Sequence, residues 1–510
     1  MTVINNNLMT RHYRNAVRVG GLAAAVVLLS ACAVTPKPLV LEQQRNLVAA
    51  DRPLIFVQQE AITGPITQEE ALARALKYNL EHRLMLMEAA LRNDQLHRSR
   101  FDMLPALTIN SGYVSRSNEN LNLSRDTGSG ALSTNPSISQ DRDILTGNLT
   151  LSWNILDFGV SYFQARQNAD QYLIAQERRR RVVNQVVQQV RNAYWRAATA
   201  EPLFEQVAPL LVQAKEALED ARAVEEQRLT PPLESLEYQK GLVEVIRELE
   251  GMEMDLAMAK SELASLMGLP PGLSYELALP EETDLTPPTL KLTIEEMEEL
   301  ALLRRPELIE ERYQQRISAS ETRKTLLRMF PGLNLSSSGN SDSNSYLVNQ
   351  TWADAAARLT WNLLNLASGP SSLRAARTAE DVTDMRRLSL SMAALTQVHL
   401  SHQQFLKSSS SYQQAKTLND IESRIFVHVS QAADNNARSE LQRIRAQMAA
   451  IYAEVNSYRA YADVQGSLAN LYVSMGLELL PEEVQSHDVN DVAVEIKSAL
   501  ERWNNGDISI

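Results

Sequence analysis

Four stretches of the chain alternate between hydrophobic and polar residues, a period of two that is typical of a β-strand with two different faces. Leu107 and Ile109 alternate with Thr108 and Asn110, and the run from Leu149 to Ile155 alternates in the same way. Shorter runs lie at 333–336 and 358–363. We predict strands at about 104–116, 145–157, 331–338 and 352–365.

Between and after these runs the sequence predicts very long helices. Glycine is absent from 160–240 and proline from 371–480. From 242 to 266 apolar residues occupy the a and d positions of a heptad, and smaller residues occupy the positions 208 residues later. We predict helical hairpins at about 160–268 and 370–476. Pro202 and Pro209 are expected to kink or interrupt the first long helix.

The chain repeats its own plan. Residues 67–72 match 293–298 at an offset of 226, and Trp-Asn-Ile-Leu at 153–156 matches Trp-Asn-Leu-Leu at 361–364 at an offset of 208. Two repeats therefore share the order of short helix, strand, loop, strand and long hairpin. The predicted divisions are repeat 1 at 66–269, a proline-rich linker at 270–291, repeat 2 at 292–479 and a C-terminal segment at 480–510.

The N-terminus reads as a secretory signal peptide over residues 1–31. Three arginines precede a short apolar run, Gly20 to Leu29, which is too short to span a bilayer. The sequence Leu29-Ser30-Ala31-Cys32 follows and resembles the bacterial lipobox. We predict that Cys32 is lipidated and that 32–65 form an extended segment behind it. The alternative is an ordinary signal peptide followed by an incidental cysteine.

Composition and charge exclude several classes of protein. A net charge of −12 over 510 residues argues against a nucleic-acid-binding protein. One cysteine is too few for a disulfide framework or a cysteine-rich zinc site. The sequence contains no glycine-rich phosphate loop and no nucleophile elbow. We therefore expect no enzyme activity, no cofactor and no metal site, and we predict no transmembrane helix.

The predicted strands are long enough to span a membrane at a tilt, and the loops between them are rich in Ser, Asn, Asp and Gly. Four strands cannot close a barrel, and an open edge is not tolerated in lipid. A membrane barrel would therefore need strands from several copies, and three copies would supply about twelve strands. A half-buried sheet in a soluble protein would show the same alternation and remains the alternative.

The ordered motifs resemble one family. Met-Leu-Pro-Ala-Leu at 103–107, Leu-Ser-Trp-Asn-Ile-Leu-Asp at 151–157, the lipobox and the duplication together resemble the TolC family of outer-membrane efflux proteins, in its lipoprotein branch. The resemblance implies a mainly α fold with a β-barrel part. A homotrimer would share one twelve-stranded barrel, four strands per chain, above a periplasmic α-helical tunnel.

The same resemblance implies a function and partners. The chain would be the passive outer-membrane channel of a tripartite efflux or type I secretion system in a Gram-negative bacterium. Its partners would be a periplasmic adaptor protein, an inner-membrane transporter driven by protons or by ATP, and outer-membrane lipid. The alternative from another class is a coiled-coil structural lipoprotein that forms no channel, although such a spacer would not need four amphipathic strands.

In the TolC family the tunnel closes at the periplasmic hairpin tips. The best-known member narrows there through an acidic pair, whose matching positions in this sequence are Gln442 and Arg445. The repeat-equivalent positions are Glu234 and Glu237, three residues apart and hence on one helix face. We predict that one of these glutamates pairs with Arg438 or Arg445 across the closed aperture. Solvated tip charges are the alternative.

The hairpin turns are the expected contacts for the adaptor. The candidate residues are Arg228, Thr230 and Pro231 in the first turn and Asn436 and Ser439 in the second.

Overall fold

The computed structural model describes residues 37–56, 59–227, 231–278, 285–434, 440–478 and 488–506. Its chain divides into two compact units, Met1–Gln59 and Glu60–Ile510. The predicted signal peptide and Cys32 lie outside the described residues.

Unit 1 contains helix α2, Leu41–Ile55, none of whose side chains is buried. The expectation of an extended segment over 32–65 is therefore wrong for these fifteen residues. The reason is local, because Leu, Gln, Arg and Ala are good helix formers and dominate the segment up to Pro53.

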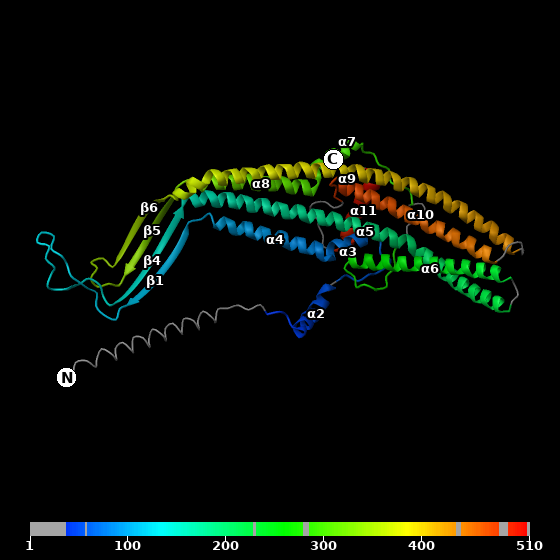
Figure 1. Cartoon of the computed structure of the whole chain (residues 1–510), viewed down its shortest axis with the longest axis horizontal. Helices are drawn as coiled ribbons and strands as arrows, with labels where there is room; N and C mark the ends of the chain where they lie inside the picture. The colour runs from blue at the N-terminus through cyan, green and yellow to red at the C-terminus, as the bar shows by residue number, and fades with distance from the viewer. Residues whose placement is uncertain are drawn as a thin grey trace, which may run out of the picture. The chain divides into compact units, whose positions relative to one another are not determined.

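Unit 2 contains both repeats and the C-terminal helix (Figure 1). The first repeat has helices α3 (Gln68–Tyr78), α4 (Leu80–Phe101), α5 (Ile155–Glu226) and α6 (Pro232–Leu266), with strands β1 (Ala106–Ser115) and β4 (Asp143–Asn154). The second has α7 (Ile294–Arg304), α8 (Pro306–Leu327), α9 (Leu363–Asp434) and α10 (Glu440–Ser474), with β5 (Gly332–Asp342) and β6 (Thr351–Thr360). Helix α11 (Val489–Asn504) follows, and the short strands β2 (Leu121–Asn122) and β3 (Ser137–Ile138) lie in the β1–β4 loop.

The two helical hairpins have matching lengths. Helices α5 and α9 have 72 residues each, and α6 and α10 have 35 each. Every bound of the second hairpin follows its counterpart by 208 residues: Ile155 to Leu363, Glu226 to Asp434, Pro232 to Glu440 and Leu266 to Ser474. The offset read from short sequence motifs therefore extends over the whole hairpin.

The strand-to-helix junctions differ from the prediction. Strand β4 ends at Asn154 and β6 at Thr360, earlier than the predicted ends at 157 and 365. The amide oxygen of Asn154 accepts hydrogen bonds from the backbone N–H groups of Leu156 and Asp157, and that of Asn362 accepts one from Leu364. Each asparagine of the repeated Trp-Asn motif is therefore a helix N-cap, so the long helices begin before 160 and 370.

Helix α5 continues unbroken through Pro202 and Pro209, so neither proline interrupts it, and the expected kink stays a prediction. Val207 and Leu210 flank Pro209 and are buried in a cluster with Leu242 and Ile444. Packing against α6 and α10 on this scale offsets the backbone hydrogen bond that Pro209 removes.

The four long strands form one antiparallel sheet in the order β1-β4-β5-β6, and the short strands β2 and β3 pair separately. Strand β1 pairs with β4 in the first repeat, β4 pairs with β5 across the repeats, and β5 pairs with β6 in the second. The sheet lies at one end of the long helices (Figure 1). One sheet therefore joins the two repeats.

The helices form a single curved layer near the sheet, in which α4 packs on α5, α5 on α8 and α8 on α9 (Figure 1). Farther from the sheet, α6 packs on α5, α5 on α10 and α10 on α9. The predicted heptad positions Leu242, Leu249 and Leu263 are fully buried. Among the described residues no helix is long and apolar enough to cross a bilayer.

Candidate functional site

One face of the four-stranded sheet is apolar and uncovered. The ladders place Ile109 opposite Leu149, Leu107 opposite Leu151 and Leu333 opposite Leu359, all on the same face. Ile109 is 81% exposed, and Leu107 and Leu359 are about equally open at 65% and 66%. A contiguous apolar surface of this kind normally contacts lipid or another protein.

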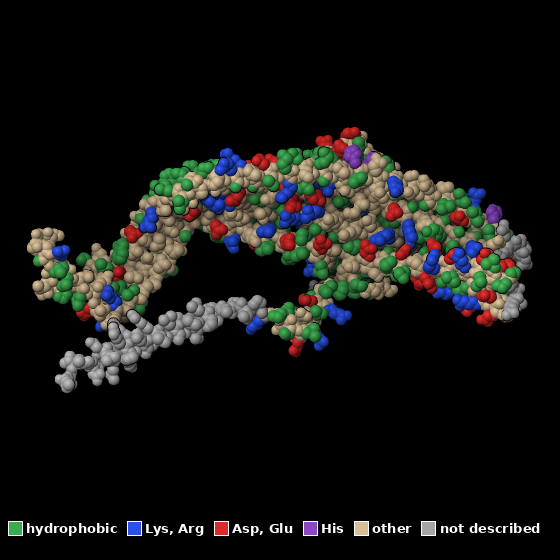
Figure 2. Space-filling model, in the orientation of Figure 1, with side chains coloured by type: hydrophobic (Ala, Val, Ile, Leu, Met, Phe, Trp, Pro, Cys, Tyr) green, Lys and Arg blue, Asp and Glu red, His purple; other side chains and the backbone are tan. Residues whose placement is uncertain are grey.

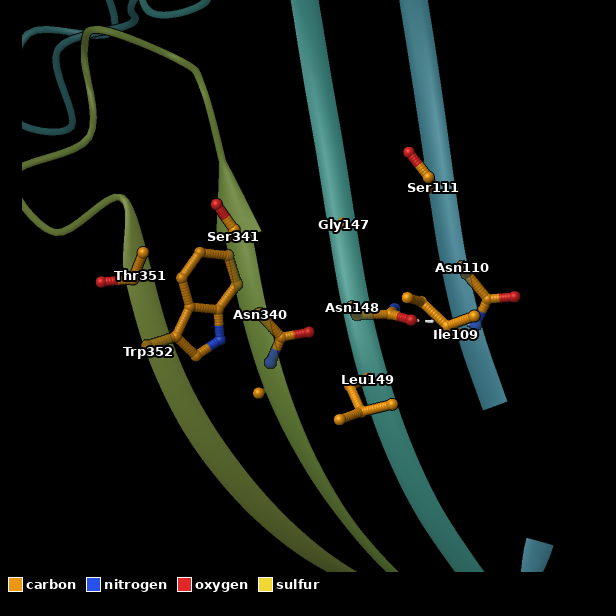
Figure 3. A pocket seen from close by; sticks show the side chains of 11 residues that line it. Ile109, Asn110, Ser111, Gly147, Asn148, Leu149, Asn340, Ser341, Thr351 and Trp352 are labelled. Atoms are coloured by element: carbon orange, nitrogen blue, oxygen red, sulfur yellow. Dashed lines mark hydrogen bonds between the residues drawn. The ribbon is translucent and has the colours of Figure 1, made fainter. Parts of the chain in front are cut away.

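The opposite face of the sheet is polar. Asn110, Asn148, Asn340 and Trp352 lie in register across the four strands. The Nδ2 of Asn110 donates to Oδ1 of Asn148 at 2.8 Å. Figure 3 shows the indole of Trp352 reaching from β6 toward β5 beside Asn340. We call Asn110, Asn148 and Asn340 the asparagine row.

A carboxylate lies one row from the asparagines. Asp354 is in register with Ser338, and its carboxylate accepts hydrogen bonds from Oγ of Ser338 and, at 3.1 Å, from Nδ2 of Asn340. The four strands are described over their whole length, and the other charged residues on this face are Asp342 and Arg358, toward the two ends. Asp354 is thus the single charged residue in the middle of the polar face, where most of its neighbours are amides and hydroxyls.

The sheet has two free edges. Strands β1 and β6 each pair on one side within the chain. Because three antiparallel pairings separate them, β1 and β6 run in opposite directions, so β6 of one copy can pair with β1 of another in an all-antiparallel ladder. The edges therefore suit closure by identical copies.

The edge helices carry matching apolar stripes. Helix α4 exposes Leu80, Leu84, Met87 and Leu91, and α9 exposes Val382, Met385, Leu388 and Met392. Both sets recur every three or four residues, which places each on one helix face. Figure 2 shows hydrophobic side chains gathered along the edge that α9 forms. The two sides of unit 2 that end in free strands thus also carry helices with an uncovered apolar stripe.

The loops that join the strands are fastened to each other. Asn344, 5% exposed, accepts a hydrogen bond from the backbone N–H of Asp141 at 3.1 Å and donates to the carbonyl of Ser139 at 3.2 Å. The carboxylate of Asp141 accepts from the hydroxyl of Ser345 at 2.9 Å. The long loops of the two repeats therefore form one structure.

The predicted tip residues that the structure describes form no ion pair with one another within the chain. Glu234 and Glu237 are exposed near the start of α6, and Gln442 and Arg445 are exposed near the start of α10. Among the described side chains, neither glutamate forms an ion pair with Arg445 within the chain; the guanidinium instead lies against Gly241. Arg438 lies outside the described residues, so its predicted pairing stays a prediction.

The predicted adaptor contacts fall mostly outside the described residues. Arg228, Thr230, Asn436 and Ser439 are not described, whereas Pro231 is exposed and is the N-cap of α6. No cluster of three or more His, Cys, Asp or Glu side chains able to hold a metal occurs in the described part of the chain.

Sequence reasoning missed five residues of the site. The asparagine row and Asp354 become visible only when the strand register is known, although their alternation with apolar residues was already in the sequence. The fifth is Gly241, one of several glycines in the helical part, whose contact with Arg445 joins two segments more than 200 positions apart.

Solved structures share this fold. CmeC, an outer-membrane channel of Campylobacter jejuni, matches 89% of this chain and 95% of its own length with a TM-score of 0.64 and 13% sequence identity. The open-state MtrE outer-membrane channel of Neisseria gonorrhoeae matches 80% of this chain and 89% of its own, with a TM-score of 0.63 and 16% identity. The outer membrane protein VceC of Vibrio cholerae matches 80% of this chain and 96% of its own, with a TM-score of 0.60 and 11% identity.

The chain therefore has the fold of outer-membrane channels. This is the fold that its resemblance to the TolC family implied, and the predicted fold class is confirmed. No protein-family model matches the sequence, and no curated protein is significantly similar to it.

Proposed function

We propose that this chain is one subunit of a passive outer-membrane channel that exports substrates delivered from the inner membrane. The observation that carries the proposal is the four-stranded sheet, with one apolar face, one polar face and two free antiparallel edges. Unpaired edges are not tolerated in lipid, so the sheet requires neighbours. Three copies joined through β1 and β6 would close a barrel of about twelve strands, which is within the known size range.

The helices support the same assembly. The apolar stripes on α4 and α9 would meet when β6 of one copy pairs with β1 of the next, because each stripe lies on the helix next to a free strand. Their burial would extend the barrel into a helical tunnel. The polar face, with the asparagine row and Asp354, would line the interior, and the apolar face would contact lipid.

A passive tunnel of this kind would need protein partners that supply energy and substrate. A passive duct needs an energy source elsewhere, so the tips would engage a periplasmic adaptor and through it an inner-membrane transporter driven by protons or ATP. The turns containing Arg228, Thr230 and Pro231 and containing Asn436 and Ser439 are the proposed contacts. Glu234 or Glu237 would pair with Arg438 or Arg445 of a neighbouring copy in the closed state.

The decisive experiment is reconstitution of the purified protein in planar bilayers, together with gel migration before and after heating. We expect stepwise pores and a trimer that separates on heating. A protein that forms no pores and migrates as a monomer without heating would instead support a structural coiled-coil lipoprotein. For the gate, Arg445→Ala should raise the closed-state current, and an unchanged current would refute the pairing that involves Arg445.

The anchor is proposed separately. Cys32 would carry the lipid after cleavage of residues 1–31. Metabolic labelling with radioactive palmitate should mark the wild type and not Cys32→Ser, and equal labelling of both would refute lipidation at this residue.

A further inference from the structure

We propose that Trp352 and Asp354 of β6 form a contact site for organic cations on the polar face of the sheet. The inference rests on the proposed function, in which that face lines the interior of the channel. Residues two apart on a strand project from the same face, so the indole and the carboxylate are neighbours on one wall.

The carboxylate is held in place by neutral donors. Ser338 and Asn340, both on β5, donate hydrogen bonds to its two oxygens, and neither neutralises its charge. The residues in register with Asp354 in the other strands are Ser338, Thr150 and Thr108, all hydroxyls. The negative charge therefore stays available to a passing ligand.

The indole supplies the second part of the site. Trp352 is 43% exposed and lies in register with the asparagine row, with its indole beside Asn340. Tryptophan is the side chain that best attracts a cation to its ring face. A flat ligand with a positive group could stack on the indole while its charge lies toward Asp354, and the amides of Asn340 and Asn148 could bond its polar substituents.

The site formed by Trp352 and Asp354 would favour cations over anions. An anion of the same shape would meet the negative face of the indole ring and the carboxylate, and both would repel it. In the proposed trimer three such sites would lie at one level, and a narrow passage with low-dielectric walls strengthens the attraction of each carboxylate for cations. The ligand class is thus an aromatic or apolar organic cation.

The test uses two probes of similar size, benzyltrimethylammonium and benzenesulfonate, added to single pores in planar bilayers. In the wild type the cation should reduce the current at lower concentrations than the anion. Asp354→Asn should weaken the block by the cation about two- to fivefold, the range for an exposed charge pair. Trp352→Leu should weaken it to a similar extent, whereas Asp354→Glu should keep it.

Ser336→Ala is the matched control, since Ser336 lies on the same face one row from Asp354 and should leave the block unchanged. Equal block by both probes in the wild type would overturn the site while leaving the channel intact. So would unchanged block by the cation in Asp354→Asn or, should that variant form no pores, in Trp352→Leu. A wild-type protein that forms no pores would overturn the proposed function and this site with it.

Discussion

The guanidinium of Arg445 in α10 occupies the space over Gly241 in α6 that a β-carbon would fill. A glycine in the interior of a helix costs up to about 1 kcal/mol relative to alanine. Gly241, which is unfavourable for α6 by itself, thus makes room for the exposed guanidinium of Arg445 from α10.

Gly241→Ala should therefore displace the arginine without destabilising the hairpin. The atoms in the way are the far end of a flexible side chain, and alanine favours the helix by up to about 1 kcal/mol. We expect an unchanged or higher unfolding midpoint together with the same change in closed-state current that Arg445→Ala causes. The neighbouring Lys240→Ala is the control, and it should leave both the unfolding midpoint and the closed-state current as in the wild type. If Arg445→Ala altered the closed-state current and Gly241→Ala did not, the position of the guanidinium over Gly241 would be unimportant for closure.

A buried lysine joins the two repeats beside the sheet. Nζ of Lys324 in α8 donates to Gln164 and Gln167 of α5 at 2.8 and 3.0 Å and to Glu321 at 2.8 Å. Lys324→Met would leave the buried amide oxygen of Gln167 without its donor, which should cost about 2 kcal/mol of unfolding free energy. Chemical denaturation in detergent measures the loss.

The double variant Lys324→Met with Gln167→Leu should be less destabilised than the sum of the two single variants, because the partners are removed together. Lys215→Met is the control, since its pair with Glu250 is half exposed and should be worth less than about 1 kcal/mol. Strict additivity of the two changes would contradict the network.

The contact between the strand loops predicts a local effect. Asn344→Ala removes both bonds to residues 139 and 141, which should lower the cost of opening the 116–142 loop by about 1–2 kcal/mol. Limited proteolysis should then cut this loop several times faster while the long helices stay intact. The exposed Asn135→Ala in the same loop is the control, and equal cleavage rates for the two variants would disprove the fastening role of Asn344.

The stability of α4 should depend on pH through His82. Burial lowers the pKa of His82 below its ordinary value of 6.5; the hydrogen bond to the carbonyl of Leu76 opposes this shift, and Arg179 adds to it. As the pH falls through 6.5, the unfolded chain takes up a proton at this residue before the folded chain does. Stability is therefore lost as the pH falls below 6.5.

His82→Gln should remove this part of the pH dependence. We expect the wild-type unfolding midpoint to fall more between pH 7.5 and pH 5.5 than that of the variant. The exposed His97→Gln on the same helix is the control and should behave like the wild type. A variant with the same pH dependence as the wild type would show that His82 does not contribute.

The strands and long hairpins could be predicted because their patterns are local and occur twice. Alternation at Leu107 and Ile109 indicates a strand, and the heptad at Leu242 and Leu249 indicates a helix. Because the chain is duplicated, each pattern can be checked against its copy in the other repeat. The junctions at Asn154 and Asn362 were misplaced because an asparagine after a strand continues the polar alternation and also caps a helix.

The candidate site was less predictable, because its geometry depends on pairing between distant segments. Asp354 is one of many acidic residues until the register places it beside Ser338 and Asn340. The tip charges depend on assembly in the same way. Within one chain the guanidinium of Arg445 lies against Gly241 of α6. The pairing with Glu234 or Glu237 across the aperture involves neighbouring copies and stays a prediction.

The shared offset of 208 residues limits how this chain can change in length. An insertion in one hairpin alone would extend its tip by about 1.5 Å per residue and turn every later side chain by about 100° around the helix axis. The seam positions of that hairpin would then leave the core while those of its twin stayed in place. Viable length variants should therefore arise in pairs, one in each half, and in steps close to a whole heptad. The two hairpins must then keep equal lengths during evolution, even though little sequence identity remains between them.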